Sequence, residues 1–332
     1  MTYHILHITT PNCYLYAEKG LLFCRFDDES ENKMPIDDIR AIIVVTHQVG
    51  FSNSCLAKLM EKDVVILHCN NKYKPIGWSA GFDRVVRTKA FYNQIKQNED
   101  FENQLWKIIL KQKVLNQAYN LELLSADSSN LLRLINKPLM NEANIAKQYW
   151  ALYFETLENP QKREHQNAES YENICLNYGY AVFQTLIYRS VLVHGLLPNL
   201  GIHHEEKYNS NPLIYDLVEP FRAFVDFYLY KFKQSFGGDF KRHDLKAWNK
   251  YLAFCIKNYR LKINGTSYKI IDYVDLYIEE IVNSFINFNT KDVILPNIKE
   301  QYLHIDKHRN REYEEGVNSI RNIASCGGYY EE

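Results

Sequence analysis

The spacing of hydrophobic residues changes near residue 80, and this change limits the folds open to the chain. Before it, short β-branched and aromatic runs such as HILHITT, AIIVVT and VVILHC alternate with turn residues, which is typical of β-strands. After it, apolar residues recur with the helical period of 3.6 to about residue 325. We therefore expect an α+β, multi-domain chain. A small, mostly-β domain over residues 1–80 precedes a linker at 81–95 and a larger all-α domain over residues 96–332.

The composition is that of a globular protein with a substantial core. Of the 332 residues, 46% are hydrophobic and 24% are charged, which excludes a disordered chain. The formal net charge of −1 gives no overall indication of a polyanionic partner, so such a partner must be sought in local charge. The seven cysteines are scattered and form no C-x-x-C pair, which argues against a disulfide framework or a cysteine zinc site. We expect a protein of the reducing cytoplasm.

Motifs for nucleotide-driven chemistry and for membranes are missing from the sequence. Neither G-x-x-x-x-G-K-[ST] nor G-x-G-x-x-G occurs, so the chain has no recognisable loop for nucleotide phosphates. The longest apolar segment, residues 181–197, is interrupted by Gln184, Arg189 and His194. We interpret it as a buried helix and expect no membrane association.

One segment is strongly basic. Residues 231–262 contain nine Lys or Arg residues against two Asp or Glu, interleaved with seven aromatic residues. This mixture suits a groove that follows a phosphate backbone and stacks bases on aromatic rings. A solvated helix face backed by core aromatics explains it equally well.

A second stretch, GIHHEEKYNSNPLIYDLVEPFR at 201–222, raises the possibility of a metal site. Asp216 and Glu219 have the spacing of a helix-capping box, which is the simplest interpretation. Glu142 stands at another predicted helix start, where the helix dipole alone favours an acid. Two such carboxylates with a loop histidine could instead hold Mg²⁺ or Mn²⁺ with positions left for phosphate oxygens. Spacing alone leaves both interpretations open.

Four segments together form a recognisable pattern: NEANIAKQYW around Glu142, LNYGYAVFQTLIYRSVLVHGLLPNLGIHH ending at His204, LIYDLVEPFRAFVD with Asp216 and Glu219, and KVLNQ at 113–117. With them the chain resembles the CRISPR-associated integrase-nucleases of the adaptation module, the Cas-one family. The order of Glu, then G-x-x-H, then an acid before P-F-R is specific, and the likeness extends over nearly the whole chain.

The resemblance implies that Glu142, His204 and Glu219 bind one or more Mg²⁺ or Mn²⁺ ions, although many family members have Asp where Glu219 stands. Asp216 matches a further family acid that could support a ligand or serve as one. His203 could take the place of His204 if the loop is shifted by one residue.

The implied reaction inserts short foreign DNA fragments into a CRISPR array, by attack of the fragment's 3′-hydroxyl on a phosphodiester. With water as the nucleophile, the same site would be an endonuclease. The implied partners are double-stranded DNA, as both fragment and repeat, a second copy of the chain bound largely through residues 1–80, and the small protein Cas-two.

Two other functions remain possible from the sequence: a non-catalytic nucleic-acid-binding scaffold, and a metal hydrolase of small phosphoesters. In the basic segment, we expect DNA contacts from Lys241, Arg242, Lys246 and Lys250.

Overall fold

The computed structural model describes residues 4–70, 75–81, 88–96, 98–135, 142–165, 167–204, 210–236 and 245–303. The chain packs into two compact units. The first contains Met1–Leu110, Tyr180–Glu219 and Ile271–Leu295, and the second contains Lys111–Gly179, Pro220–Ile270 and Pro296–Glu332. Helices α3 (Glu99–Leu123) and α6 (Tyr171–Val193) each contribute residues to both units.

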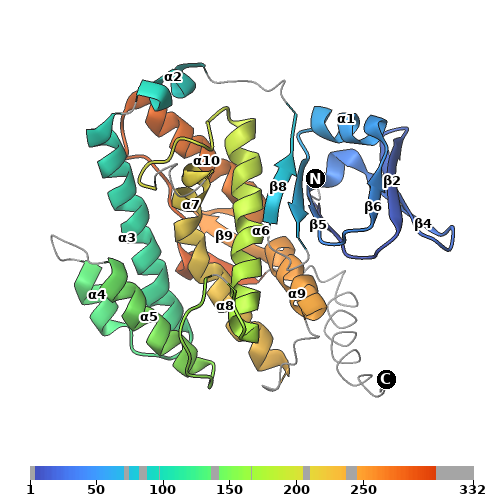
Figure 1. Ribbon diagram of the computed structural model, residues 1–332. Coiled ribbons are helices and arrows are strands. Elements are labelled where there is room, and N and C mark those ends of the chain that lie inside the picture. The colour runs from blue at the N-terminus through green and yellow to red at the C-terminus, as the bar shows by residue number, and fades with distance from the viewer. Residues whose placement is uncertain are drawn as a thin grey trace. The chain divides into compact units, whose positions relative to one another are not determined.

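The N-terminal part of the first unit is rich in strands, as the sequence predicts (Figure 1). One four-stranded sheet has the order β1-β5-β7-β8 and is parallel except for β8. Its strands are β1 His4–Ile8, β5 Ile39–Val44, β7 Val65–Cys69 and β8 Pro75–Ser79. The other has the order β4-β3-β2-β6, with β2 Cys13–Glu18, β3 Leu21–Arg25, β4 Glu31–Pro35 and β6 Val49–Phe51. Alternating apolar side chains of both sheets form one core, which includes Leu15 and Ile66.

The remaining first-unit elements are mostly helical. They are η1 Ile36–Asp38, α1 Asn53–Glu61, α2 Thr88–Lys96, α7 Pro212–Val218 and most of α10 Ile270–Asn287. Ser52 caps α1 by accepting a hydrogen bond from the amide of Cys55 at 3.1 Å. Helix α2 corrects the prediction of a linker at 81–95. The buried side-chain amide of Gln94 holds α2 in place, because its Nε2 donates hydrogen bonds to the carbonyls of Leu197 and Leu200.

Helices dominate the second unit. Besides its parts of α3 and α6, it contains α4 Ser129–Ile135, α5 Glu142–Thr156, α8 Arg222–Phe236 and α9 Leu245–Asn258. Gly179 of α6 allows a close helix contact, since a Cβ there would meet Val225 of α8 and Trp248 of α9. The predicted apolar helix at 181–197 is confirmed in part by α6 and is largely buried. Within the described ranges, the structure has no helix of the length and apolarity that crossing a membrane demands.

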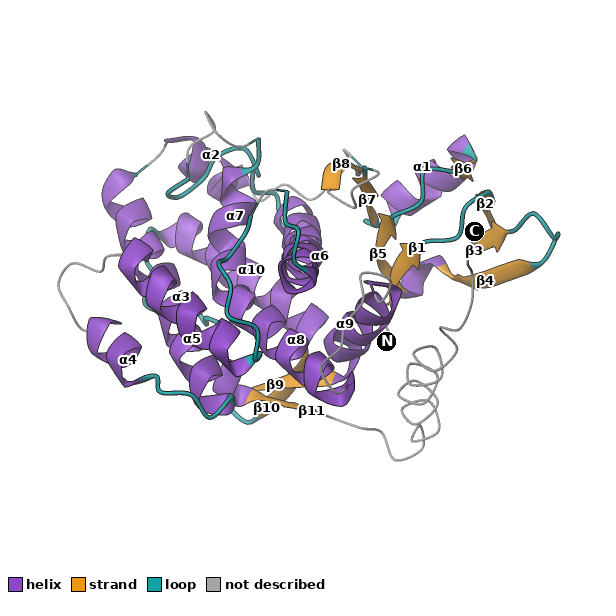
Figure 2. Cartoon of the chain, turned by 60° about the horizontal axis from the view of Figure 1, so that its bottom comes forward, coloured by secondary structure: helices purple, strands orange, loops and turns teal. Residues whose placement is uncertain are grey.

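The prediction that residues 96–332 are all-α is wrong. Strands β9 Tyr259–Ile263, β10 Thr266–Lys269 and β11 Gln301–Leu303 form an antiparallel sheet in the order β10-β9-β11, as Figure 2 shows. The hairpin between β9 and β10 turns through Asn264 and Gly265, whose φ angles are +48° and +82°. Asn-Gly is the sequence most favoured for two such left-handed residues, so the local turn overrides the surrounding helical pattern. A short 3₁₀ helix, η5 Ile298–Glu300, directly precedes β11 in the sequence.

Candidate functional site

The carboxylate of Asp216 holds the histidine loop in place. Its Oδ2 accepts hydrogen bonds from the amides of Ile202 at 2.6 Å and His203 at 3.0 Å. Its Oδ1 accepts from the amide of His204 at 3.2 Å and lies 2.6 Å from the Nδ1 of the same residue. Because an ionised carboxylate can only accept, Nδ1 is the donor of this contact, and in the neutral imidazole the lone pair is then on Nε2. A carboxylate behind a histidine in this way is the arrangement that commonly orients a metal-binding imidazole.

Gly201 is the glycine of the G-x-x-H pattern, and the geometry explains why a glycine stands there. A Cβ at this position would collide with the carbonyl oxygen of His204, and it would lie 2.7 Å from Cβ of Pro212 and 3.1 Å from Oδ2 of Asp216. The loop can therefore fold over the Asp216 carboxylate only if no side chain intervenes.

The two histidines have different environments. The ring of His203 stacks on Trp106 of α3, with centroids 4.3 Å apart and planes 7° apart. The ring of His204 meets the same indole edge-on at 5.9 Å, and its side chain is 43% exposed. Both rings thus contact Trp106, and the ring nitrogen of His204 also contacts the Asp216 carboxylate. This arrangement favours His204 over His203 as a ligand.

The two acids do not form the capping box that their spacing permits. Asp216 lies inside α7 and is completely buried, whereas a capping residue precedes its helix. Glu219 is the C-cap of α7 and begins the short helix η3, Glu219–Phe221, with 5% of its surface exposed. A buried carboxylate is costly unless it is paired or bound to a cation, so both acids require a reason beyond capping.

Glu142 begins α5, as predicted, and its carboxylate has a cationic partner. Nζ of Lys113 on α3 lies 2.6 Å from its Oε1; the Lys113 side chain is 11% exposed and that of Glu142 is 41% exposed. Seven residues further along both helices, Nδ2 of Asn120 donates to Oη of Tyr149 at 2.9 Å. These two contacts, one heptad apart, align α3 and α5 and fix where the first turn of α5 presents Glu142.

The adjacent Asn116 of α3 fixes a backbone segment next to Glu219. Its Nδ2 donates to the carbonyl of Pro220 at 2.8 Å and to that of Pro296 at 2.7 Å, while its Oδ1 accepts from the amide of Ile298 at 3.1 Å. The segment KVLNQ therefore supplies structural anchors from one helix face, through Lys113 and Asn116.

Two contacts of the predicted site residues are defined, one inside each unit. His204 and Asp216 contact each other, and Glu142 contacts Lys113. In the part of the chain that the structure describes, no three His, Cys, Asp or Glu side chains cluster as a metal site. The assignment of Glu142, His204 and Glu219 to one ion thus remains a prediction.

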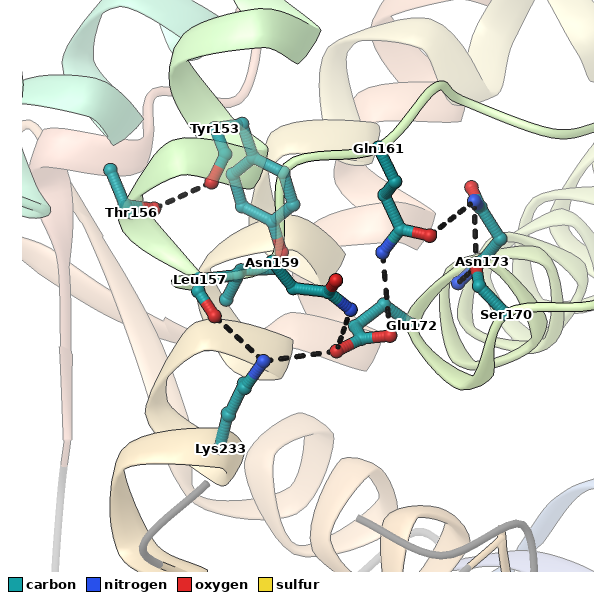
Figure 3. A network of polar contacts seen from close by, with 9 residues as sticks. All are labelled: Tyr153, Thr156, Leu157, Asn159, Gln161, Ser170, Glu172, Asn173 and Lys233. Carbon is teal, nitrogen blue, oxygen red and sulfur yellow. Dashed lines mark hydrogen bonds and ion pairs between the residues drawn. The ribbon is translucent and has the colours of Figure 1, made fainter. Parts of the chain in front are cut away.

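The basic segment divides into structural and exposed residues. Lys233 donates to Glu172 at 2.9 Å and to the carbonyl of Leu157 at 2.7 Å, and Figure 3 shows this buried network. Burial opposes ionisation of Glu172, but hydrogen bonds from Asn159 and Lys233 outweigh it and lower the pKa of that carboxyl. Lys233 is thereby committed to the fold.

The aromatics of the basic segment are also partly structural. Phe232 and Trp248 are fully buried and pack 5.4 Å apart, so the interpretation as core aromatics holds for them. Lys246 and Lys250 are exposed on α9, which is compatible with DNA contact. Lys241 and Arg242 lie outside the described residues.

Lys113 and Trp106 were missed as contributors to the site, although the sequence contains a signal for Lys113. Its spacing from Ile109, Asn116 and Asn120 follows the 4-3-4 pattern of a buried helix stripe, so a lysine there requires a partner. Trp106 offers no such signal, because a buried tryptophan on this stripe is ordinary core.

Comparison with known proteins identifies the family. The family model described as CRISPR associated protein Cas1 matches residues 6–247. The chain is 26% identical over 294 residues to the CRISPR-associated endonuclease Cas1 of Neisseria meningitidis serogroup C (strain 8013), covering 86% of this chain and 93% of that protein.

Two solved structures share the fold. A casposase bound to its integration product has a TM-score of 0.76 at 17% identity, covering 97% of this chain and 100% of that one. A Cas6-RT-Cas1–Cas2 complex has a TM-score of 0.72 at 15% identity, covering 90% of this chain and 36% of that one. With the family match extending over more than two thirds of its length, the chain belongs to the Cas1 family of CRISPR-associated proteins.

Proposed function

We propose that the chain is a divalent-metal-dependent DNA integrase and endonuclease that inserts short DNA fragments into a CRISPR array. The observation that carries the proposal is the hydrogen bond between Nδ1 of His204 and the carboxylate of Asp216. It leaves Nε2 of the neutral imidazole as the nitrogen with a lone pair, on a side chain that is 43% exposed. The Cas1 relative is named an endonuclease, and the casposase of the same fold holds an integration product; both support this reaction class.

The donor set fits Mg²⁺ or Mn²⁺. We infer that Glu142 and Glu219 supply carboxylate oxygens and that His204 supplies Nε2, with Asp216 supporting His204 from behind. Sites with mostly oxygen ligands and one imidazole suit these ions. Three protein ligands would leave coordination positions for phosphate oxygens. Glu219 has the longer arm where aspartate is common in the family, so its carboxylate reaches further from the end of α7.

The reaction exchanges one phosphodiester for another. The 3′-oxygen of the fragment bonds to a phosphorus of the repeat, the bond from that phosphorus to its 3′-oxygen breaks, and a proton passes from the attacking hydroxyl to the leaving oxygen. A bound ion would polarise the phosphoryl oxygen and stabilise the leaving oxygen. Lys113 keeps the Glu142 carboxylate in place, and Asp216 keeps His204 in one tautomer. Because bonds are exchanged, the missing nucleotide-binding motif is expected.

The partners follow from the same proposal. Lys241, Arg242, Lys246 and Lys250 contact the DNA backbone. Residues 1–80 pair two copies of the chain, and Cas2 joins this homodimer. The Cas1–Cas2 complex of the same fold supports the last point.

A plasmid assay tests the function. Supercoiled plasmid is incubated with the protein, Mn²⁺ and an oligonucleotide that ends in a 3′-hydroxyl. Joining of the oligonucleotide to the plasmid supports the integrase. If no joining occurs and DNA binds equally well with and without Mn²⁺, the chain is instead a non-catalytic scaffold. Cleavage of small phosphoesters alone would assign a metal hydrolase.

A further inference from the structure

The sheet β10-β9-β11 presents five polar side chains on one face. In its register, Arg260 of β9 pairs with Lys269 of β10 and with Tyr302 of β11, and Lys262 pairs with Ser267. Residues directly opposite each other in a sheet lie on the same face, and so do residues two apart in one strand. These five residues, the basic sheet face, therefore point to the same side.

The other side of the sheet packs against the helices of the second unit. Leu261 is fully buried, and the ring of Tyr259 lies 5.0 Å from that of Tyr228 on α8. Tyr228 also donates its hydroxyl to Gln301 of β11 at 3.2 Å. The basic sheet face is consequently the outward one: Lys262, Ser267 and Tyr302 are exposed, and Arg260 and Lys269 are half-buried.

The charged side chains that these three strands contribute are all cationic. The three strands contain three cationic side chains and no Asp or Glu; the nearest acid in sequence, Glu300, precedes β11. An exposed surface of this kind attracts phosphate groups, and each contact releases a condensed counterion.

Two side chains of the face are also held in position. The guanidinium of Arg260 donates to the carbonyl of Lys257 at 2.8 Å. The hydroxyl oxygens of Tyr302 and Ser267 are 2.6 Å apart, which anchors the side chain of a residue that is still 39% exposed. Ordering these groups in advance reduces the entropy lost when a ligand binds.

We propose that the basic sheet face binds single-stranded nucleic acid, with a base stacked on Tyr302 and phosphates on Arg260, Lys262 and Lys269. A tyrosine among cations favours unpaired bases, because a duplex hides the faces of its bases inside the stack. An acidic protein would use the cations but leave the exposed ring unexplained. The choice of DNA rests on the proposed function, whereas the binding itself needs no divalent ion.

Oligonucleotide binding in EDTA tests the proposal. Fluorescence anisotropy is measured over a series of salt concentrations with a labelled single-stranded DNA and with its duplex. Tyr302→Leu is expected to weaken single-strand binding at least about fivefold through lost stacking and to leave duplex binding unchanged. Tyr302→Phe, which retains the ring, should bind nearly as the unaltered chain does.

The salt dependence of binding tests the cationic side chains of the face. Lys262→Gln should reduce the slope of log affinity against log salt by about 0.7, the value for one phosphate contact on a single strand. Lys291→Gln is the matched control, since Lys291 is exposed in a loop that follows α10 and should change nothing.

Unchanged single-strand affinity in Tyr302→Leu and Lys262→Gln would overturn the proposal, and so would equal losses for single strand and duplex. If the two variants instead lose binding of polyglutamate and retain that of DNA, the face belongs to an acidic protein. Failure of the proposed function is distinguishable, because it would appear as absent strand transfer by the unaltered chain in the plasmid assay.

Discussion

The Nδ1 atom of His204 lies 2.6 Å from Oδ1 of Asp216, and the same carboxylate accepts the amides of residues 202–204. One buried acid thus sets both the path of the loop and the tautomer of its histidine.

Asp216→Asn should disturb both. An amide in this position turns an N–H₂ group toward backbone donors, so unfolding by urea should reveal a loss of about 1–3 kcal/mol. Mn²⁺ binding, followed by titration calorimetry, should weaken about 10–100-fold, as when the partner behind a metal-binding histidine is removed. DNA binding in EDTA is the control and should remain. An unchanged Mn²⁺ affinity in a folded variant would contradict the role given to Asp216.

Lys113 is expected to act through Glu142. Lys113→Met removes the 2.6 Å contact and leaves the Glu142 carboxylate without its positioning partner. Strand transfer at fixed Mn²⁺ should fall by about tenfold, within the range for groups that orient a metal ligand. Lys113→Arg keeps the charge and should recover part of the activity. Equal activity in the Met and Arg variants would show that the contact orients nothing. Lys111, which is exposed two residues earlier on the same helix, provides the matched control as Lys111→Met.

Variants of His203 and His204 show which of the two histidines is the metal ligand. His203→Ala loses its stack on Trp106, which costs about 0.5–1.5 kcal/mol of stability. Most strand transfer should survive, and His203→Phe should restore the lost stability because it can stack in the same place. The reverse pattern, an active His204→Ala enzyme and an inactive His203→Ala enzyme, would place the ligand one residue earlier in the loop.

His7 gives the first unit a dependence on pH. Burial lowers the pKa of His7 on β1 from 6.5 to about 4, so the unfolded chain takes up a proton before the folded one does. The stability due to neutral His7 is complete above pH 6.5 and is lost as pH falls toward 4. Between pH 7 and pH 5 the loss should be about 2 kcal/mol. Urea unfolding at both pH values measures it, and His7→Phe should remove most of the difference. A difference of the same size in the variant would assign the effect to other groups.

Much of the fold can be predicted from the local spacing of hydrophobic residues. The change of hydrophobic period near residue 80 correctly indicates strands before helices, because it reports which side chains face a core. The third sheet was predicted wrongly as helix, although Asn264-Gly265 is a strong hairpin signal. β11 could not have been found in this way, since its three residues pair with β9 from about forty positions away.

The site is less predictable from the sequence than the fold. The spacing of Asp216 and Glu219 fits a capping box, and only the three-dimensional path of the loop shows that Asp216 points back at residues 202–204. The spacing of Lys113 along α3 indicates that it needs a partner, but the sequence does not show that this partner is Glu142. Local sequence encodes helix starts, whereas these contacts join residues 12 and 29 positions apart.

The central claim is that Glu142, His204 and Glu219 bind one divalent ion, and strand transfer by variants of these three residues tests it most directly. Alanine at any of them should abolish Mn²⁺-dependent joining of a 3′-hydroxyl oligonucleotide to plasmid while DNA binding stays nearly intact, because the ion acts on the reacting phosphate. Glu219→Gln is the sharpest variant, since it keeps the shape of the side chain and removes only the negative charge. We predict an inactive Glu219→Gln enzyme; an active one with normal Mn²⁺ dependence would contradict the ligand assignment and most of the proposed mechanism.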